Sequence, residues 1–348
     1  MTTLINETLA RIRPVDPHWI ERARARQLEL TKPPGSLGRL EEIANRVAAI
    51  QETLSPKVDR ARLVLFAADH GVCAEGVNPY PQAVTAQMVA NFVRGGAAIN
   101  ALASVAGVDL EIVDAGVAHE IPETAGLVRR PLGRGTANFC QGPAMTAEQA
   151  VAALELGIAA CAGDAHLLGI GEMGIANSTA AAAVTAALTG LDAASVTGRG
   201  TGADDACMDR KRSAIARALA LHEPEIQGPL DILARLGGFE IGGMAGLCLG
   251  AAANRHAVVV DGFIATAAAA LAVRLHPAVA DYLIPAHRSI EPGHPPLLEV
   301  IGHRPLLDLE MRLGEGTGAA LAIPIVRAAV AAFTGMATFA AAGVSGAS

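Results

Sequence analysis

Apolar and polar positions alternate in blocks along this chain, and the blocks predict strands and helices in turn. Five short runs of consecutive apolar residues each end in glycine or polar residues, which is typical of strands buried on both faces. The runs are 62–71, 109–117, 165–174, 256–262 and 281–289. Alanine-rich helical segments, such as 179–188 and 265–275, lie between them. Strand and helix in alternation predict an α/β fold with a parallel sheet covered on both faces.

The two ends of the chain carry helical patterns without strands between them. Apolar residues recur at helical spacing in 39–52, with charged residues on the opposite face. The C-terminal segments are apolar and helical, and no linker rich in Pro or Ser separates independent domains. We therefore expect a large α/β domain at 59–300 and a small helical lobe formed by 1–58 and 301–348.

Composition limits the classes of protein that this chain can belong to. Of its 348 residues 51% are hydrophobic and only 3% are aromatic, so a sizeable core must consist of Ala, Val, Leu and Ile. A net charge of −7 and the lack of a basic run argue against a nucleic-acid partner. The five cysteines are scattered and form no CxxC pair, so we expect reduced thiols in a cytoplasmic protein.

One segment raises the question of a membrane. Residues 328–348 carry no charge and are long enough to span a bilayer. They are mostly Ala, Gly, Thr and Ser, whose small side chains supply little transfer free energy. We expect a buried, close-packed helix here and no membrane partner. The charged start of the chain is also unlike a secretory signal.

Polar residues follow the predicted strands at their carboxyl ends, where parallel sheets bind ligands. These residues are Asp69, His70, Asp114, Glu172, Asp261, His287 and Ser289. At any single position, an Asp that caps the next turn is the simpler interpretation. Several such positions together predict a polar crevice.

One glycine motif offers an alternative function. Residues 169–174 match GxGxxG, and Asp192 lies at the distance of a ribose-binding acid, which together are typical of a nicotinamide-dinucleotide-dependent oxidoreductase. Two features weaken this interpretation. No strand precedes Asp192, and Glu172 inside the loop would repel a pyrophosphate. The loop can still hold a single phosphate through its backbone N–H groups.

Two further glycine loops carry candidate chemistry. Residues 196–205 contain Arg199 and are followed by Lys211, a set that suits a phosphorylated small molecule, although a solvated charged helix explains Lys211 alone. Glu315 lies between two glycines and is a candidate general base, since burial would raise its pKa. An exposed loop glutamate has the same pattern. HExxH and GxSxG are absent, which disfavours metal and serine mechanisms.

Several long motifs occur in order over roughly 31–343 and together resemble one family, the nicotinate-nucleotide–dimethylbenzimidazole phosphoribosyltransferases. They are KPPGSLGRLE, ADHGVCAEGVNPYPQAVTAQMVANFVRGGAAIN, DAGV, GTANF, GIGEMGIANST, GRGTGAD, GGFEIGGMAG and LGEGTGAALA. The resemblance implies a Rossmann-like sheet, a lobe from both chain ends and a homodimer. It also implies phosphoribosyl transfer from nicotinate mononucleotide to a benzimidazole, with no cofactor and no metal. A non-catalytic nucleotide-binding regulator stays an alternative.

The resemblance also assigns roles to residues of this chain. It makes Glu315 the catalytic base and Glu172 a second, supporting carboxylate. It places the base slot near Asn78, Tyr80 and Gln87, and the phosphate near the GRGTG loop. The substrate-binding residues that it implies are Asn78, Tyr80, Gln87, Gly174, Gly200, Gly202, Lys211, Ser289 and Leu313.

Overall fold

A single parallel sheet organises the protein, as seen in a computed structural model that describes residues 2–122 and 124–345. Its strands are β1 Ala61–Ala68, β2 Asp109–Gly116, β3 Leu127–Arg129, β4 Leu167–Met173, β5 Ala257–Val260 and β6 Leu283–Pro285. They lie in the order β3-β2-β1-β4-β5-β6, and every neighbouring pair is parallel. From β1 the strand order runs outward through β2 and β3 on one side, and from β4 through β5 and β6 on the other. The carboxyl ends of β1 and β4 therefore form a topological switch point, where such sheets bind ligands. The predicted α/β fold with a Rossmann-like sheet is confirmed.

All five predicted strands are present, and one further strand was not predicted. Strand β3 has only three residues at the edge of the sheet, and its side chains are partly exposed. Such a short segment has no apolar run, so the pattern of the sequence could not reveal it.

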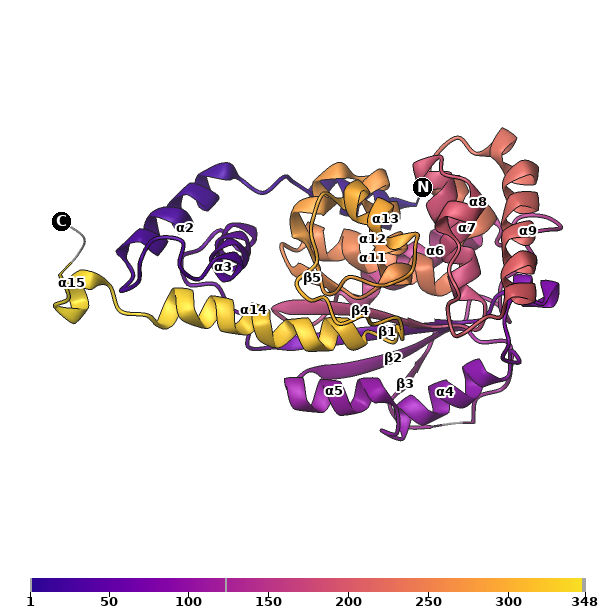
Figure 1. The fold of residues 1–348 in the computed structure, drawn as a ribbon, viewed down its shortest axis with the longest axis horizontal. Helices are drawn as coiled ribbons and strands as arrows, with labels where there is room; N and C mark the ends of the chain where they lie inside the picture. The colour runs from indigo at the N-terminus through magenta and orange to yellow at the C-terminus, as the bar shows by residue number, and fades with distance from the viewer. Residues whose placement is uncertain (1, 123, 346–348) are drawn as a thin grey trace.

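Helices cover both faces of the sheet (Figure 1). Helices α11 and α12 contact the sheet on one face, and α4, α5 and α14 contact it on the other. Those before the fourth strand are α1 Thr3–Arg11, α2 Pro17–Glu29, α3 Arg39–Ile50, α4 Val84–Val93, α5 Ala98–Ala106 and α6 Ala147–Ala160. The later ones are α7 Asn177–Thr189, α8 Ala193–Val196, α9 Asp205–His222, α10 Pro229–Leu236, α11 Phe239–Ala253, α12 Phe263–Leu275, α13 His294–Ile301, α14 Thr317–Gly335 and α15 Phe339–Ala342.

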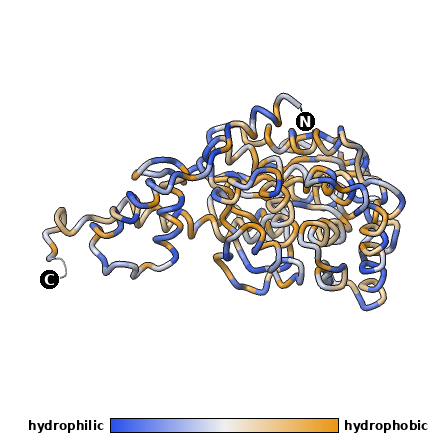
Figure 2. Tube along the Cα trace, turned by 90° about the horizontal axis from the view of Figure 1, so that it is seen from above, coloured by the Kyte–Doolittle hydropathy of each residue, from blue (hydrophilic) through white to orange (hydrophobic). Residues whose placement is uncertain are grey.

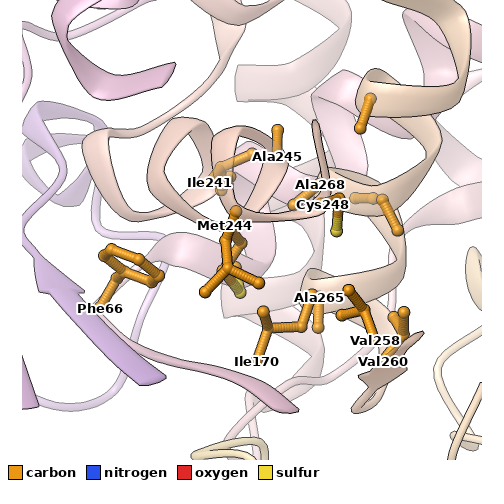
Figure 3. Packing of buried hydrophobic residues seen from close by; sticks show 14 of the residues in the cluster. Phe66, Ile170, Ile241, Met244, Ala245, Cys248, Val258, Val260, Ala265 and Ala268 are labelled. Atoms are coloured by element: carbon orange, nitrogen blue, oxygen red, sulfur yellow. The ribbon is translucent and has the colours of Figure 1, made fainter. Parts of the chain in front are cut away.

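The core between the sheet and α11 is built from aliphatic and small side chains, as the composition predicts. Figure 3 shows Phe66, Ile170 and Val258 of the sheet facing Met244 and Cys248 of α11. Helix α11 is buried along almost its whole length because α6 and α12 cover its other sides. Glycine permits the closest approach: a Cβ at Gly157 of α6 would lie only 1.9 Å from the Gly243 carbonyl oxygen.

Helices α2 and α3 form a projection from the body together with the last part of α14 and with α15, which lies at its tip (Figures 1 and 2). Helix α2 packs on α3, and α3 packs on α14. The Thr31 N–H donates to the Ala337 carbonyl at 3.1 Å, so the ends are also joined through their backbones. Helix α1, by contrast, packs on α11 and α6 of the body. The division into 59–300 and a lobe of 1–58 and 301–348 stays a prediction.

The expectation of one buried helix over 328–348 is wrong. Helix α14 ends at Gly335, and the short α15 follows after an extended residue, Met336. Helix α14 is long and apolar enough to cross a membrane by length and composition, yet 50% of its most apolar window is buried inside the protein. A core helix has the same properties, and α14 packs against β4 and β5. Residues 346–348 lie outside the described residues.

Candidate active site

A cavity of about 420 Å³ opens at the carboxyl ends of the strands, beside the switch point. Its lining comes from the segments that follow β1, β4, β5 and β6, together with the loop that precedes α14. Ligand pockets in proteins commonly measure about 300–1,000 Å³, so the cavity can hold a nucleotide-sized molecule. The predicted polar crevice therefore exists, and several strand-end residues line it.

Glu315 lies in the loop before α14, with its side chain facing this cavity. Its φ is +63°, and Gly314 and Gly316 on either side both have φ of +83°. The side chain is buried, and its Oε2 has no hydrogen-bond partner among the described residues. Burial raises the pKa of Glu315 to about 7, and the charge of Asp261 adds to this effect. The carboxylate can therefore take up and release a proton near neutral pH.

Glu172 lies at the end of β4, in the same cavity. It is buried, and the Asn177 side chain donates a hydrogen bond to its Oε2. Burial first, and then the charges of Asp261 and Glu240, raise its pKa to about 8. At neutral pH, Glu172 therefore holds a proton, whereas Glu315 is divided between its two forms.

A second buried pair stands behind the β4–α7 turn. His70 Nε2 lies 2.5 Å from Glu240 Oε1, and neither side chain is exposed. Burial opposes charge on His70, but the Glu240 carboxylate outweighs it and raises the pKa of His70. The ring lies close to Gly174 of the turn, where a Cβ would be 3.4 Å from His70 Cδ2. The pair thus supports the backbone that carries Glu172.

Two of the residues predicted to bind the phosphate, Lys211 and Gly200, make hydrogen bonds within the protein. Lys211 lies behind the cavity wall, where its Nζ donates to Ser178 Oγ at 3.1 Å and to the Gly198 carbonyl at 2.9 Å. Its burial lowers the pKa of this ammonium group. The Gly200 N–H, expected to face a phosphate, donates to Glu291 Oε1 at 2.9 Å. The N–H groups of Gly200 and Gly202 and the Lys211 ammonium group therefore donate to other groups of the protein in this structure.

Most of the predicted site residues line the cavity together. These are Asn78, Tyr80, Glu172, Gly174, Gly200, Ser289, Leu313 and Glu315. Gln87, Gly202 and Lys211 do not line it. Val84 and Met88 of α4, one helical turn apart, face the cavity, while Gln87 is exposed beside them. The roles of all these residues stay predictions.

Several lining residues were not predicted. They are Asn177, Ser178, Glu291, Arg312 and Phe263 among others. These five lie within five residues of a predicted strand-end or loop residue, and Asn177 and Ser178 also stand in the GIGEMGIANST motif. Glu291 belongs to none of the motifs, so only its position near Ser289 could have indicated it.

The dinucleotide-binding interpretation of GxGxxG is not supported by the geometry. Gly169 and Gly171 lie within β4 itself and pack against neighbouring chain segments instead of forming a phosphate-binding turn. A Cβ at Gly171 would lie 2.7 Å from the Glu315 carbonyl oxygen. Asp192 does not end a strand; it caps the short α8, with its Oδ1 accepting from the Ser195 N–H at 2.8 Å. These glycines thus serve packing beneath Glu315.

Comparison with known proteins identifies the family. The profile of a phosphoribosyltransferase family matches residues 12–344. The nicotinate-nucleotide–dimethylbenzimidazole phosphoribosyltransferase of Geobacter metallireducens is 52% identical over 346 residues, which are 98% of each chain. The chain belongs to this family. The enzyme of that name from Chloroflexus aggregans is also 52% identical, over 99% of this chain and 98% of its own.

Solved structures agree with the sequence relatives. The crystal structure of the enzyme of that name from Thermus thermophilus matches with a TM-score of 0.90 and 49% identity, covering 95% of this chain and all of that one. Membership in the family makes the protein a pentosyltransferase. The alternatives of an oxidoreductase and of a regulator without catalysis therefore lose their basis.

Proposed function

We propose that this protein transfers the 5-phosphoribosyl group of nicotinate mononucleotide to 5,6-dimethylbenzimidazole, giving α-ribazole 5′-phosphate and nicotinate. The relatives carry this activity in their names. One observation from the site supports it most: Glu315 and Glu172 face the same cavity with pKa values near neutral but different. Two such carboxyl groups can serve different steps of a proton-transfer reaction.

A single general base is sufficient for the chemistry of this reaction. The ring nitrogen of nicotinate mononucleotide is cationic, so nicotinate leaves C1′ with the bonding electron pair and needs no proton. The free nitrogen of the benzimidazole forms the new bond to C1′, and positive charge develops on its ring. The other ring nitrogen then releases its proton to Glu315. The negative charge of Glu315 also stabilises the cationic transition state.

Glu172 has a supporting role in this scheme. Because its pKa is raised to about 8, it is protonated at neutral pH and can donate a hydrogen bond into the cavity. A protonated Glu172 also adds no second negative charge beside Glu315, which would hinder the ionisation of that base. The Asn177 amide, which donates to Glu172 Oε2, fixes the direction of the carboxyl group.

The remaining lining divides into an apolar and a polar region. Tyr80, Val84, Met88 and Leu313 supply the apolar wall that a benzimidazole requires, and the polar Asn78 lies beside Tyr80. Ser178 and Ser289, with the charge of Lys211 behind Ser178, supply the region suited to the phosphate. In this arrangement C1′ lies between the two regions, near Glu315, so binding orients the reacting atoms.

We also propose that the protein is a cytoplasmic homodimer. Tyr80 and Leu313, which line the cavity, are 49% and 55% exposed, and Ile290, between the lining residues Ser289 and Glu291, is 54% exposed. A second copy of the chain could cover them. Light scattering at micromolar concentration should give twice the monomer mass of 35.4 kDa; a monomer would contradict the proposal.

The test of the reaction is direct. The protein is incubated with nicotinate mononucleotide and 5,6-dimethylbenzimidazole, and both products are identified by mass. Nicotinate and α-ribazole 5′-phosphate should appear in equal amounts, and neither should form when 5,6-dimethylbenzimidazole is left out. Parallel reactions with other benzimidazoles, purines and phenols give the preferred base. Binding of nicotinate mononucleotide with no nicotinate released in any reaction would overturn the proposal.

A further inference from the structure

Asp261 joins the end of β5 to the start of the helix that follows Glu315. It is the first residue after β5 and is 1% exposed. Its Oδ2 accepts the Gly316 N–H at 3.0 Å, and its Oδ1 accepts those of Gly318 at 2.7 Å and Ala319 at 3.2 Å. Helix α14 has no side-chain cap of its own, since its N-cap residue is a glycine. Asp261 supplies the cap from a distant strand.

This cap acts directly on the backbone of Glu315. The Gly316 N–H belongs to the peptide unit that follows Glu315, so the bond to Asp261 fixes how that unit is oriented. The carbonyl of the same peptide unit lies against Gly171 of β4, where a Cβ would be only 2.7 Å away. Glu315 has a left-handed backbone, which residues with a Cβ disfavour. Contacts on both sides of this peptide unit therefore keep Glu315 facing the cavity.

We propose that Asp261 is the positioning residue of this site: it holds the peptide unit after Glu315 in place and sets the charge around both glutamates. The inference rests on the proposed function for what Glu315 does, but not for how Glu315 is held. Asp261 also lines the cavity, but its carboxylate accepts hydrogen bonds from backbone N–H groups next to Glu315, so it works through Glu315.

The charged groups around Asp261 define its electrostatic effect. Glu172 faces it from β4, Glu315 from the loop before α14, and His287 from the segment after β6, with Nε2 3.7 Å from Asp261 Oδ1. Glu240 of α11 acts on Glu172 in addition. Burial raises the pKa of Asp261 itself, while His287 and the three backbone N–H donors favour its charged form. In that form Asp261 raises the pKa of Glu315 and of Glu172. Its removal should lower both pKa values.

The first test is Asp261→Asn, which keeps the shape of the side chain. The amide has one oxygen, so its NH₂ group must face a backbone N–H that now donates to Asp261. We expect kcat to fall about 10- to 100-fold, with KM for both substrates within about twofold, since a small misplacement of a catalytic group costs this much. The acidic limb of the kcat–pH profile should move to lower pH. Wild-type kcat with an unmoved limb would overturn the proposal.

Asp114→Asn is the matched control. Asp114 is also a buried aspartate, in the second half of β2, and its Oδ1 accepts the N–H groups of Gly116 and Val117 at 3.1 and 2.9 Å. It does not line the cavity. Because this variant also disturbs backbone N–H bonds to a buried carboxylate, it should affect folding in a similar way but leave the acidic limb at the wild-type pH. A shift as large as that of Asp261→Asn would assign the effect to general destabilisation and overturn the proposal.

Gly318→Ala separates position from charge. Its Cβ would lie 2.1 Å from His287 Cδ2 and 2.7 Å from Asp261 Oδ1, so it displaces the cap without removing a charge. We expect kcat to fall about tenfold or more with the acidic limb unmoved. If Asp261→Asn does not fold, this variant decides: a kcat within twofold of the wild type overturns the proposal.

A measurement without substrate separates this inference from the proposed function. Carboxyl carbons of ¹³C-labelled glutamate are titrated by NMR, and the Glu315 signal is identified by its loss in Glu315→Gln. Its midpoint should be lower in Asp261→Asn than in the wild type, and unchanged in Asp114→Asn. An unchanged midpoint in Asp261→Asn overturns the inference, whereas a wild-type protein that releases no nicotinate overturns only the proposed function.

Discussion

The substitution Glu315→Gln tests the proposed mechanism most directly. Glutamine keeps the size of the side chain but has neither the charge nor the basicity of a carboxylate. Removal of a general base typically lowers kcat by about 10²- to 10⁴-fold. The loss of an anion that faces a cationic transition state adds to this effect. We therefore expect kcat to fall at least about a hundredfold while the protein stays folded.

The pKa of Glu315 sets the conditions of this assay. With a pKa of about 7, the wild-type carboxylate is about nine-tenths ionised at pH 8 and about one-tenth ionised at pH 6. Wild-type kcat should therefore rise with pH up to about pH 8. Glu315→Gln should have lost this limb, so the difference between the two proteins is largest at pH 8.

The assay follows nicotinate release at pH 6 to 9 with both substrates saturating. Glu172→Gln, assayed alongside, should cost less, because Glu172 has the supporting role. Calorimetric titration with 5,6-dimethylbenzimidazole should show that Glu315→Gln still binds the base. If Glu315→Gln keeps more than about a tenth of wild-type kcat at pH 8, the base lies elsewhere, and Glu172 is the first candidate.

Three further predictions concern the phosphate, the metal and stability. Lys211→Ala and Ser289→Ala should mainly raise KM for nicotinate mononucleotide, since phosphate contacts act equally in ground and transition states; wild-type KM in both variants would refute the phosphate region. Activity should survive a chelator, and a loss that Mg²⁺ restores would show that a metal is required. The folded pKa of Glu172, about 8, exceeds the ordinary value of 4.5, so the folded state retains a proton that the unfolded state releases, and stability decreases as pH rises between these values. Glu172→Gln should therefore raise Tm more at pH 8 than at pH 5, and an equal change in Tm at both pH values would contradict this.

Local patterns in the sequence were sufficient for much of the fold. Strands buried on both faces appear as continuous apolar runs, and five of the six strands were found in this way. The three-residue β3 has no such run, and its pairing with β2 is visible only in the sheet. The 328–348 segment misled for the opposite reason: its apolar composition is continuous, but α14 ends at Gly335 and Ala337 instead pairs with Thr31, far away in the sequence.

The candidate carboxylates were also visible in the sequence, because Glu172 and Glu315 stand in glycine-rich segments with characteristic motifs. Their protonation states could not be read from the sequence, since the pKa of Glu315 depends on its burial and on Asp261, which is 54 residues away along the chain. The glycines of GxGxxG show the same limit. A local pattern indicates a phosphate loop, whereas the structure places Gly171 under the Glu315 peptide.

The sequence by itself thus determined the fold class, the family and the identity of the candidate catalytic groups, because these depend on local periodicity and on motifs that are contiguous in the chain. Only the tertiary structure decided which groups share a cavity, which backbone donors are already used, and how each carboxylate is held. The Gly200 N–H, for example, donates to Glu291, 91 residues later. Such pairings bring together residues from separate strands and loops, and no local pattern records them.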